Sequence, residues 1–279
     1  MISLFASSGP VIHVAPGPVM TLFGVPISNS VLYGWICLVG LIITLIIVAR
    51  KITIKPKGGL IQFIEIAVTF MGNFVESSFE DKKVGRKYVP YFVTLFCFIL
   101  FNNWLGLLPF VGEGFTSNGF PFLRPFTGDL NATFAMAVFT MVLVYYSSVK
   151  ESGGIKRYLM HFFVGSPKNP LFLLIGILEM ITDLTRVISL SLRLFLNVAI
   201  GEIVIAVFSY LGHILAPITA LPFTLIEIFI GALQAYIFAV LGTMYLAVAV
   251  NHSAEHLSEP EEKPAPKIKS QTKVATSEV

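Results

Sequence analysis

The sequence has few charged residues, because Asp, Glu, Lys and Arg make up 13% of its 279 residues. This share is about half of what soluble domains carry. Hydrophobic residues make up 55%, and the mean hydropathy is +0.82. This balance excludes a soluble globular enzyme and a disordered chain. The formal net charge of +3 is too small to indicate nucleic-acid binding. The class that remains is an integral membrane protein.

Cysteines, a basic leader and internal repeats are also scarce or missing. Cys37 and Cys97 both lie in apolar runs, so we expect no disulfide framework. Residues 1–30 contain no Lys or Arg, so the basic start of a cleavable signal peptide is missing and we expect this segment to be retained. No internal repeat is visible, which argues against an inverted-repeat transporter.

Long apolar runs are the main feature that is present. A membrane-crossing helix needs about 20 mostly apolar residues. The polar tail 251–279 contains three prolines and four lysines and is predicted to be disordered. The runs predict five membrane helices, at 31–49, 91–108, 131–149, 171–211 and 221–250.

The segment 59–80 is amphipathic, since its polar residues recur at steps of three and four and share one side of an α-helix. Basic residues flank both ends, and such residues mark the cytoplasmic side of short loops. We therefore predict an interfacial helix that does not cross the bilayer. Its polar residues are Gln62, Glu65, Thr69, Asn73, Glu76 and Glu80.

One topology accommodates nearly all basic residues. With five crossings, an external segment 1–30 and a cytoplasmic C-terminus, sixteen of the 19 basic residues lie inside. Arg124 lies outside, and Arg186 and Arg193 lie within an apolar segment. The predicted fold class is an all-α polytopic membrane protein that forms a single membrane domain over residues 1–279.

The run 171–211 is too long for an upright helix. It contains no proline, and roughly 40 helical residues span about 60 Å, twice the hydrocarbon thickness of about 30 Å. Transmembrane helices tilt by about 20° on average. An even number of crossings here would place the C-terminal lysines outside. We therefore predict that 171–211 is one steeply tilted helix, which forms a slanted hairpin with 221–250.

Several charged and polar residues lie inside these two runs. Each charge at a helix centre costs about 2.5–3.5 kcal/mol on insertion scales, so most of them must face protein or water. Paired charges that hold a bundle together and an ion path are the two interpretations, and for Asp183 and Arg186 the i,i+3 spacing favours a local ion pair. The residues are Glu179, Asp183, Arg186, Arg193, Asn197, Glu202, Glu227 and Gln234.

Helical geometry separates the arginine from a carboxyl group. At about 100° per residue, Glu202 points to nearly the opposite side of the helix from Arg193. Carboxylic acids relay protons, whereas an arginine does not deprotonate at any relevant pH. A line of carboxyl groups that is interrupted by a permanently charged arginine favours a mechanism in which a carboxylate of another subunit carries the proton past the arginine.

The motifs around these residues resemble those of a known family. The segment Ser189–Asn197, followed by Gly201 and Glu202, closely resembles the signature of subunit a of F-type ATP synthase. The segment Leu233–Phe238 resembles the last helix of the same family. Supporting matches at 26–29, 103–109 and 129–133 follow the family order and extend the resemblance over nearly the whole chain apart from the tail. Two positions depart from the family pattern: Leu196 replaces the usual glycine and Val187 a common proline.

The resemblance implies a stator in an energy-transducing membrane such as the bacterial inner membrane. It would pass H⁺ or Na⁺ through two offset half-channels to and from the carboxylates of a rotating c-ring, and so couple ion flow to ATP synthesis. The implied partners are the c-ring, the peripheral-stalk subunit b, the rest of the F1Fo complex and the lipid bilayer. No catalytic chemistry in this chain alone, no cofactor, no metal and no nucleic acid are implied.

The resemblance also assigns roles to individual residues. Arg193 resembles the essential arginine that faces the ring carboxylate. Glu202, Glu227 and Asn197 match positions of the outer channel, and Gln234 matches a polar position near the arginine. In addition, Glu179 matches a less critical acidic position toward the inner channel.

Two other function classes remain open at this point. An ion-coupled secondary transporter would have a substrate cavity and would be active without a ring. A scaffold subunit that transports nothing would tolerate charge-neutral replacements.

Near the third crossing, Asp129 and Asn131 are predicted to cap the helix start.

The predicted topology is tested by single cysteines placed near Lys55 and near Lys83. Because both flanks of 59–80 are basic, we expect a membrane-impermeant thiol reagent to label both positions from the cytoplasmic side. Labelling of the two positions from opposite sides would contradict the five-crossing topology.

Overall fold

The computed structural model describes residues 17–22, 25–51, 59–108, 123–151 and 170–258, together with 111, 116–117, 120–121 and 154. Most of these residues are helical, which agrees with the all-α class predicted from the sequence. Four stretches are long and apolar enough to span a membrane: α1 (Asn29–Lys51), α3 (Lys82–Gly106), α4 (Leu130–Glu151) and Met180–Asn251. The last stretch runs from α6 into α7, and α2 (Leu60–Ser77) is not among the four.

Two short antiparallel hairpins add strands that the sequence analysis missed. Strand β1 (Pro18–Leu22) pairs with β2 (Val25–Ser28), and β3 (Thr116–Ser117) pairs with β4 (Phe120–Pro121). These strands are too short for a clear alternation of apolar and polar residues. The first hairpin ends directly at α1, where Asn29 N donates to Gly17 O at 3.0 Å.

Helices α6 and α7 form a long hairpin. Helix α6 (Pro170–Gly212) is a single unbroken helix, as predicted for 171–211. The short η2 (His213–Leu215) joins it to α7 (Ala216–Ser258), and His213 has a positive φ of 44°. At the turn, Thr219 Oγ1 donates to Phe208 O at 2.8 Å, and the rings of Phe208 and Phe223 stack with centroids 3.8 Å apart.

The boundaries of α7 differ from those predicted. The helix begins at Ala216 and passes through Pro222, whereas the sequence predicted a start at 221. It also continues through Ser258, past the predicted start of the disordered tail at 251. The physical reason is that Pro260 is the first proline beyond the apolar run, and a helix usually ends before the residue that precedes a proline.

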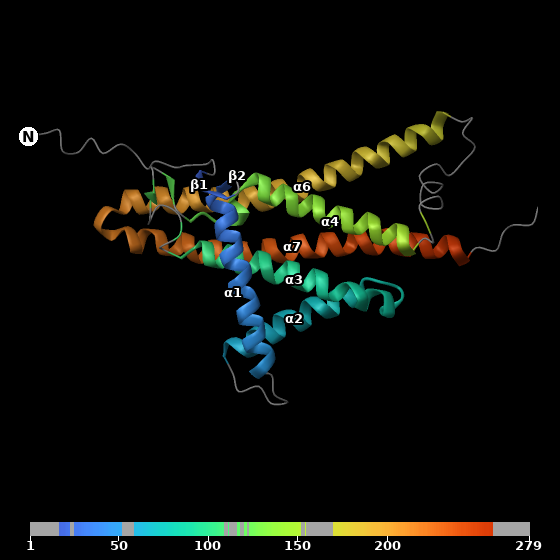
Figure 1. Cartoon of the computed structure of the whole chain (residues 1–279), viewed down its shortest axis with the longest axis horizontal. Helices are drawn as coiled ribbons and strands as arrows, with labels where there is room; N and C mark the ends of the chain where they lie inside the picture. Colours follow the sequence, from blue (N-terminus) through green and yellow to red (C-terminus); the bar gives the residue numbers. More distant parts are fainter. Residues whose placement is uncertain are drawn as a thin grey trace, which may run out of the picture.

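The other helices pack along this hairpin. Figure 1 shows α6 and α7 side by side, with α3 and α4 following them, whereas α1 runs across their direction. Helix α1 meets η1 (Phe126–Gly128) closely, because the Phe126 ring fills the space where a Cβ on Gly34 would lie. The common core is formed by buried side chains that include Phe92, Ile99, Val144, Leu194, Phe238 and Leu246.

Helix α2 presents an apolar face outward as well as inward. Met71 and Val75 are fully buried against the core, whereas Phe63, Ile66 and Phe70 are about half exposed or more. Exposed apolar side chains of this kind fit a helix that lies in a membrane interface. The interfacial position of α2 stays a prediction.

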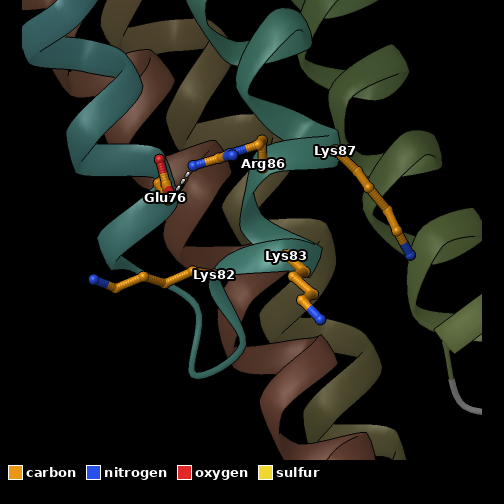
Figure 2. A pocket seen from close by; sticks show the side chains of 5 residues that line it. All are labelled: Glu76, Lys82, Lys83, Arg86 and Lys87. Atoms are coloured by element: carbon orange, nitrogen blue, oxygen red, sulfur yellow. Dashed lines mark hydrogen bonds and ion pairs between the residues drawn. The ribbon is translucent and has the colours of Figure 1, made fainter.

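Helix α3 begins at Lys82, before the predicted start at 91, because Asp81 caps it by accepting from Lys83 N at 2.8 Å. Pro90 is accommodated inside the helix. An open pocket of about 440 Å³ lies at this end of α3. Figure 2 shows the four basic side chains and Glu76 that line it. Arg86 pairs with Glu76 at 3.0 Å, and Lys87 pairs with Glu151 of α4 at 3.1 Å. Four of the basic residues that the sequence assigns to the cytoplasmic side thus lie together where α2 ends and α3 begins.

Candidate functional site

Arg193 lies at the edge of an exposed apolar stripe on α6. Its guanidinium Nη2 donates to Ser189 Oγ, one turn earlier, at 3.4 Å. Leu196 and Ile200 continue the stripe, with 45% and 55% of their surface exposed. The fixed cation therefore borders a surface that the described residues leave uncovered.

The two departures from the family pattern fall in different surroundings. Leu196 lies on the exposed stripe, so its bulk does not crowd another helix of the described chain. Val187 is half buried and packs against the core cluster. The extra side-chain volume at Leu196 is therefore accommodated on the exposed surface of α6.

An amide pair joins α6 to α7 one turn beyond Arg193. Asn197 Nδ2 donates to Gln234 Oε1 at 2.8 Å. Gln234 is almost fully buried, and its Nε2 has no hydrogen-bond partner in the part of the chain that the structure describes. The structure thus brings together two residues that the sequence analysis assigned to the site.

Glu202 and Glu227 lie next to each other near the hairpin turn. A Cβ added to Gly201 would collide with the carboxyl group of Glu227, so this glycine makes room for the acid. On the other side, Glu202 Oε1 lies 3.4 Å from the position of a Cβ on Gly128 of η1. Glu202 therefore faces η1, away from the exposed stripe of Arg193, as the helical geometry predicted.

Groups from α1, α3 and η1 surround this carboxyl pair. Asn103 Nδ2 donates to Gly231 O of α7 at 3.0 Å, and its Oδ1 accepts from Thr127 at 2.8 Å. Tyr33 of α1 donates to Asn102 O at 3.4 Å and lies within electrostatic range of Glu202. Sequence reasoning assigned no role to these residues, although Asn103 lies in one of the supporting motifs.

The start of α4 is capped as predicted. Asp129 Oδ1 accepts from Asn131 N at 3.0 Å, and Asp129 Oδ2 accepts from Ser30 Oγ of α1 at 2.6 Å. The cap is formed by Asp129 alone, because Asn131 already lies within α4. The Asp129 carboxylate therefore ties α1 to α4 and is occupied by these bonds.

Asp183 and Arg186 form the predicted local ion pair. Arg186 Nη1 donates to Asp183 Oδ1 at 2.8 Å. Tyr145 of α4 donates to the other carboxylate oxygen at 2.6 Å, and the guanidinium lies 4.9 Å from the ring centroid of Tyr245 on α7. The pair thus joins three helices, and the two tyrosines are partners that i,i+3 spacing alone does not reveal.

The remaining candidate site residues have few contacts among the described residues. Glu179 lies on α6, and its side chain falls outside the described residues. His213 lies in η2, with its ring centroid 5.9 Å from that of Tyr210. Within the described ranges, no three His, Cys, Asp or Glu side chains form a group that could hold a metal ion.

The arrangement separates a fixed charge from exchangeable ones. Glu202 follows Arg193 by nine positions along α6, which corresponds to about 13 Å at 1.5 Å per residue. Carboxyl groups bind and release protons, whereas the guanidinium stays charged. The arrangement can therefore move a cation at one end of α6 and hold a fixed positive charge at the middle.

A protein-family model described as ATP synthase A chain matches residues 31–247. Curated relatives named ATP synthase subunit a include one from Moorella thermoacetica, 32% identical over 84% of this chain and 96% of its own length. The relative from Gloeobacter violaceus is 32% identical over 82% of this chain and 86% of its own length.

Other relatives of the same name are longer. Those from two strains of Anaeromyxobacter dehalogenans are each 33% identical, over 82% and 74% of this chain. The chain spans 59% and 53% of their lengths.

The Asp183–Arg186 pair is tested by a double-mutant cycle on the thermal stability of the purified chain. Asp183→Leu leaves the guanidinium without its carboxylate, and we expect a loss of about 1–3 kcal/mol in the free energy of unfolding. The double variant Asp183→Leu/Arg186→Leu should be more stable than this single variant, because no charge is left unpaired. Thr185→Ala on the exposed side serves as the control. A double variant less stable than Asp183→Leu would contradict the pairing.

Proposed function

The chain belongs to the ATP synthase A chain family, and we propose that it is the stator subunit of the membrane sector of an F-type ATP synthase. It provides two offset half-channels that pass H⁺ or Na⁺ to and from the carboxylates of a rotating c-ring. The ion flow is coupled to ATP synthesis in another part of the F1Fo complex, so this chain carries no catalytic chemistry of its own.

The observation that carries this proposal is the position of Arg193. A charge that faces lipid at the centre of a membrane helix is expensive, yet Arg193 borders the exposed stripe of Leu196 and Ile200. A partner that brings carboxylates to this stripe removes the cost. An opposite charge within about 4–6 Å also favours the ionised form of each passing carboxylate. Arg193 therefore drives the ring carboxylate to release its ion to the inner half-channel.

The outer half-channel is formed around Glu202, Glu227 and Asn197. The two carboxyl groups lie on the far side of α6 from the exposed stripe, so an ion that reaches them has not passed the arginine. Gln234 holds Asn197 at the end of this path, between the carboxyl pair and Arg193. The inner half-channel leads to the cytoplasmic side, and the family resemblance assigns Glu179 of α6 to it.

The membrane arrangement follows the sequence prediction. We propose that α1, α3, α4, α6 and α7 cross the bilayer, with α2 in the interface, residues 1–30 outside and the C-terminal tail in the cytoplasm of a bacterium. The 43 residues of α6 span about 65 Å, and Figure 1 shows α1 running across the direction of the hairpin. Both observations support a steep tilt of α6 and α7. The peripheral-stalk subunit b then holds this chain against the rotating ring.

An ion-coupled secondary transporter is less well supported, because the family match names a subunit of ATP synthase. A scaffold subunit without transport is distinguished from the stator by the experiment that follows.

We expect Arg193→Ala to abolish coupled ATP synthesis and ATP-driven ion pumping while the chain remains inserted in the membrane. The reason is that no fixed charge then drives release of the ion from the ring. Arg193→Lys keeps a charge but loses the planar fork and is able to deprotonate when buried, so we expect it to fail as well. Both rates are measured in inverted membrane vesicles.

The matched control is Arg86→Ala, because this arginine is exposed and lies near the start of α3, on a different helix from Arg193. It should leave both rates near normal. Near-normal ATP synthesis with Arg193→Ala would contradict the role of Arg193 and would favour the scaffold.

A further inference from the structure

Arg124 is a second buried arginine, in the segment that leads into η1. Only 3% of its surface is exposed, and its Nη2 donates to Gly128 O at 2.9 Å. A guanidinium does not lose its proton at any relevant pH. Buried charges are generally stable only beside an opposite charge. The position of Arg124 thus points to carboxylates in its surroundings.

The opposite charge nearest to Arg124 in the proposed outer half-channel is the carboxyl group of Glu202. Gly128, whose carbonyl Arg124 holds, is the same residue against which Glu202 packs, at 3.4 Å from its Cβ position. Arg124 and Glu227 both lie within electrostatic range of Glu202. Glu227 is 9% exposed and fills the space beside Gly201. Arg124 therefore lies near Glu202, which is partly buried and lies beside the buried Glu227.

Three other titratable groups in this region do not supply a positive charge to the Glu202–Glu227 pair. Asp129 follows Gly128 in the chain, but it is itself a carboxylate that accepts from Ser30 Oγ and Asn131 N, so it supplies no positive charge. Tyr33, the remaining titratable group in range of Glu202, adds no positive charge. Arg193 lies on the opposite side of α6, beside Ser189.

We propose that Arg124 is a positioning residue that balances the Glu202–Glu227 pair at one net negative charge, so that the pair carries one exchangeable cation. This inference rests on the proposed function and deepens it. Two carboxylates that share a site do not readily ionise together. With one cation bound, the two carboxyl groups together carry one negative charge, and Arg124 offsets it. When one cation enters from the outer water and another leaves toward the ring carboxylate, the pair and Arg124 together return to zero net charge.

The plain alternative is that Arg124 only fixes the turn through Gly128 O. Two substitutions separate these roles. In Arg124→Gln the amide is able to donate to the same carbonyl but carries no charge. In Arg124→Lys the charge is kept, although the planar fork is lost. The measurements are ATP-driven pumping and ion-driven ATP synthesis by the complete complex in inverted vesicles, normalised to the amount of assembled complex.

We expect Arg124→Gln to lower both coupled rates at least tenfold and Arg124→Lys to retain at least a third of them. Arg86→Gln, an exposed arginine at the opposite end of α3, controls for the loss of a positive charge and should retain full rates. The proposal is overturned if Arg124→Gln keeps near-normal rates, or if Arg124→Lys fails as completely as Arg124→Gln.

If Arg124→Gln does not accumulate in membranes, the double variant Arg124→Gln/Glu227→Gln decides the matter. Restored accumulation supports the charge balance, because one buried carboxylate has been removed with the cation. Unrestored accumulation supports the turn role and overturns the proposal. Failure of this inference is distinct from failure of the proposed function. An active Arg124→Gln with an inactive Arg193→Ala contradicts the inference alone.

Discussion

The cost of charge in apolar surroundings is the constraint on which the rest of this structure depends. The long hairpin carries several ionisable side chains through a largely apolar segment. Each must find a partner, water or an opposite charge. Asp183 and Arg186 meet this condition inside the chain, by pairing with each other and with tyrosines of α4 and α7. Glu202 and Glu227 lie next to each other near the hairpin turn, and Arg124 lies near Glu202. Arg193 has a neutral partner in Ser189 and borders an open surface.

The fold serves this separation of charges. Glycines at 128 and 201 leave the space that the two carboxyl groups occupy, and the short η1 fits between α1 and α6 because Gly34 admits the Phe126 ring. Asn103 links α3, η1 and α7 by its two hydrogen bonds. The end of the hairpin that carries Glu202 and Glu227 is thus packed against α1, α3 and η1. The middle of α6, by contrast, keeps one face that the described residues leave uncovered, and this is the face proposed to meet the ring.

Much of this arrangement was predictable from local rules. The missing prolines predict the unbroken α6, the i,i+3 spacing predicts the Asp183–Arg186 pair, and 100° per residue places Glu202 opposite Arg193. Contacts between distant segments were not predictable in this way. Arg124 counts in the sequence as an external basic residue, and only the packing of η1 on α6 brings it to Glu202. The tyrosines at 145 and 245 likewise gain their role from helix packing, and the β-hairpins are too short to leave a periodic signal.

The central claim is that the exposed stripe of α6 beside Arg193 faces a ring of partner subunits. The most direct measurement is photo-crosslinking in intact membranes from a photoreactive residue at position 200, which lies on this stripe and is 55% exposed. The matched position is 142, which is 57% exposed and lies on α4 instead of α6. The account predicts crosslinks from position 200 to the ring subunit and none from position 142. Crosslinks to the ring from position 142, with position 200 reaching lipid alone, would contradict it.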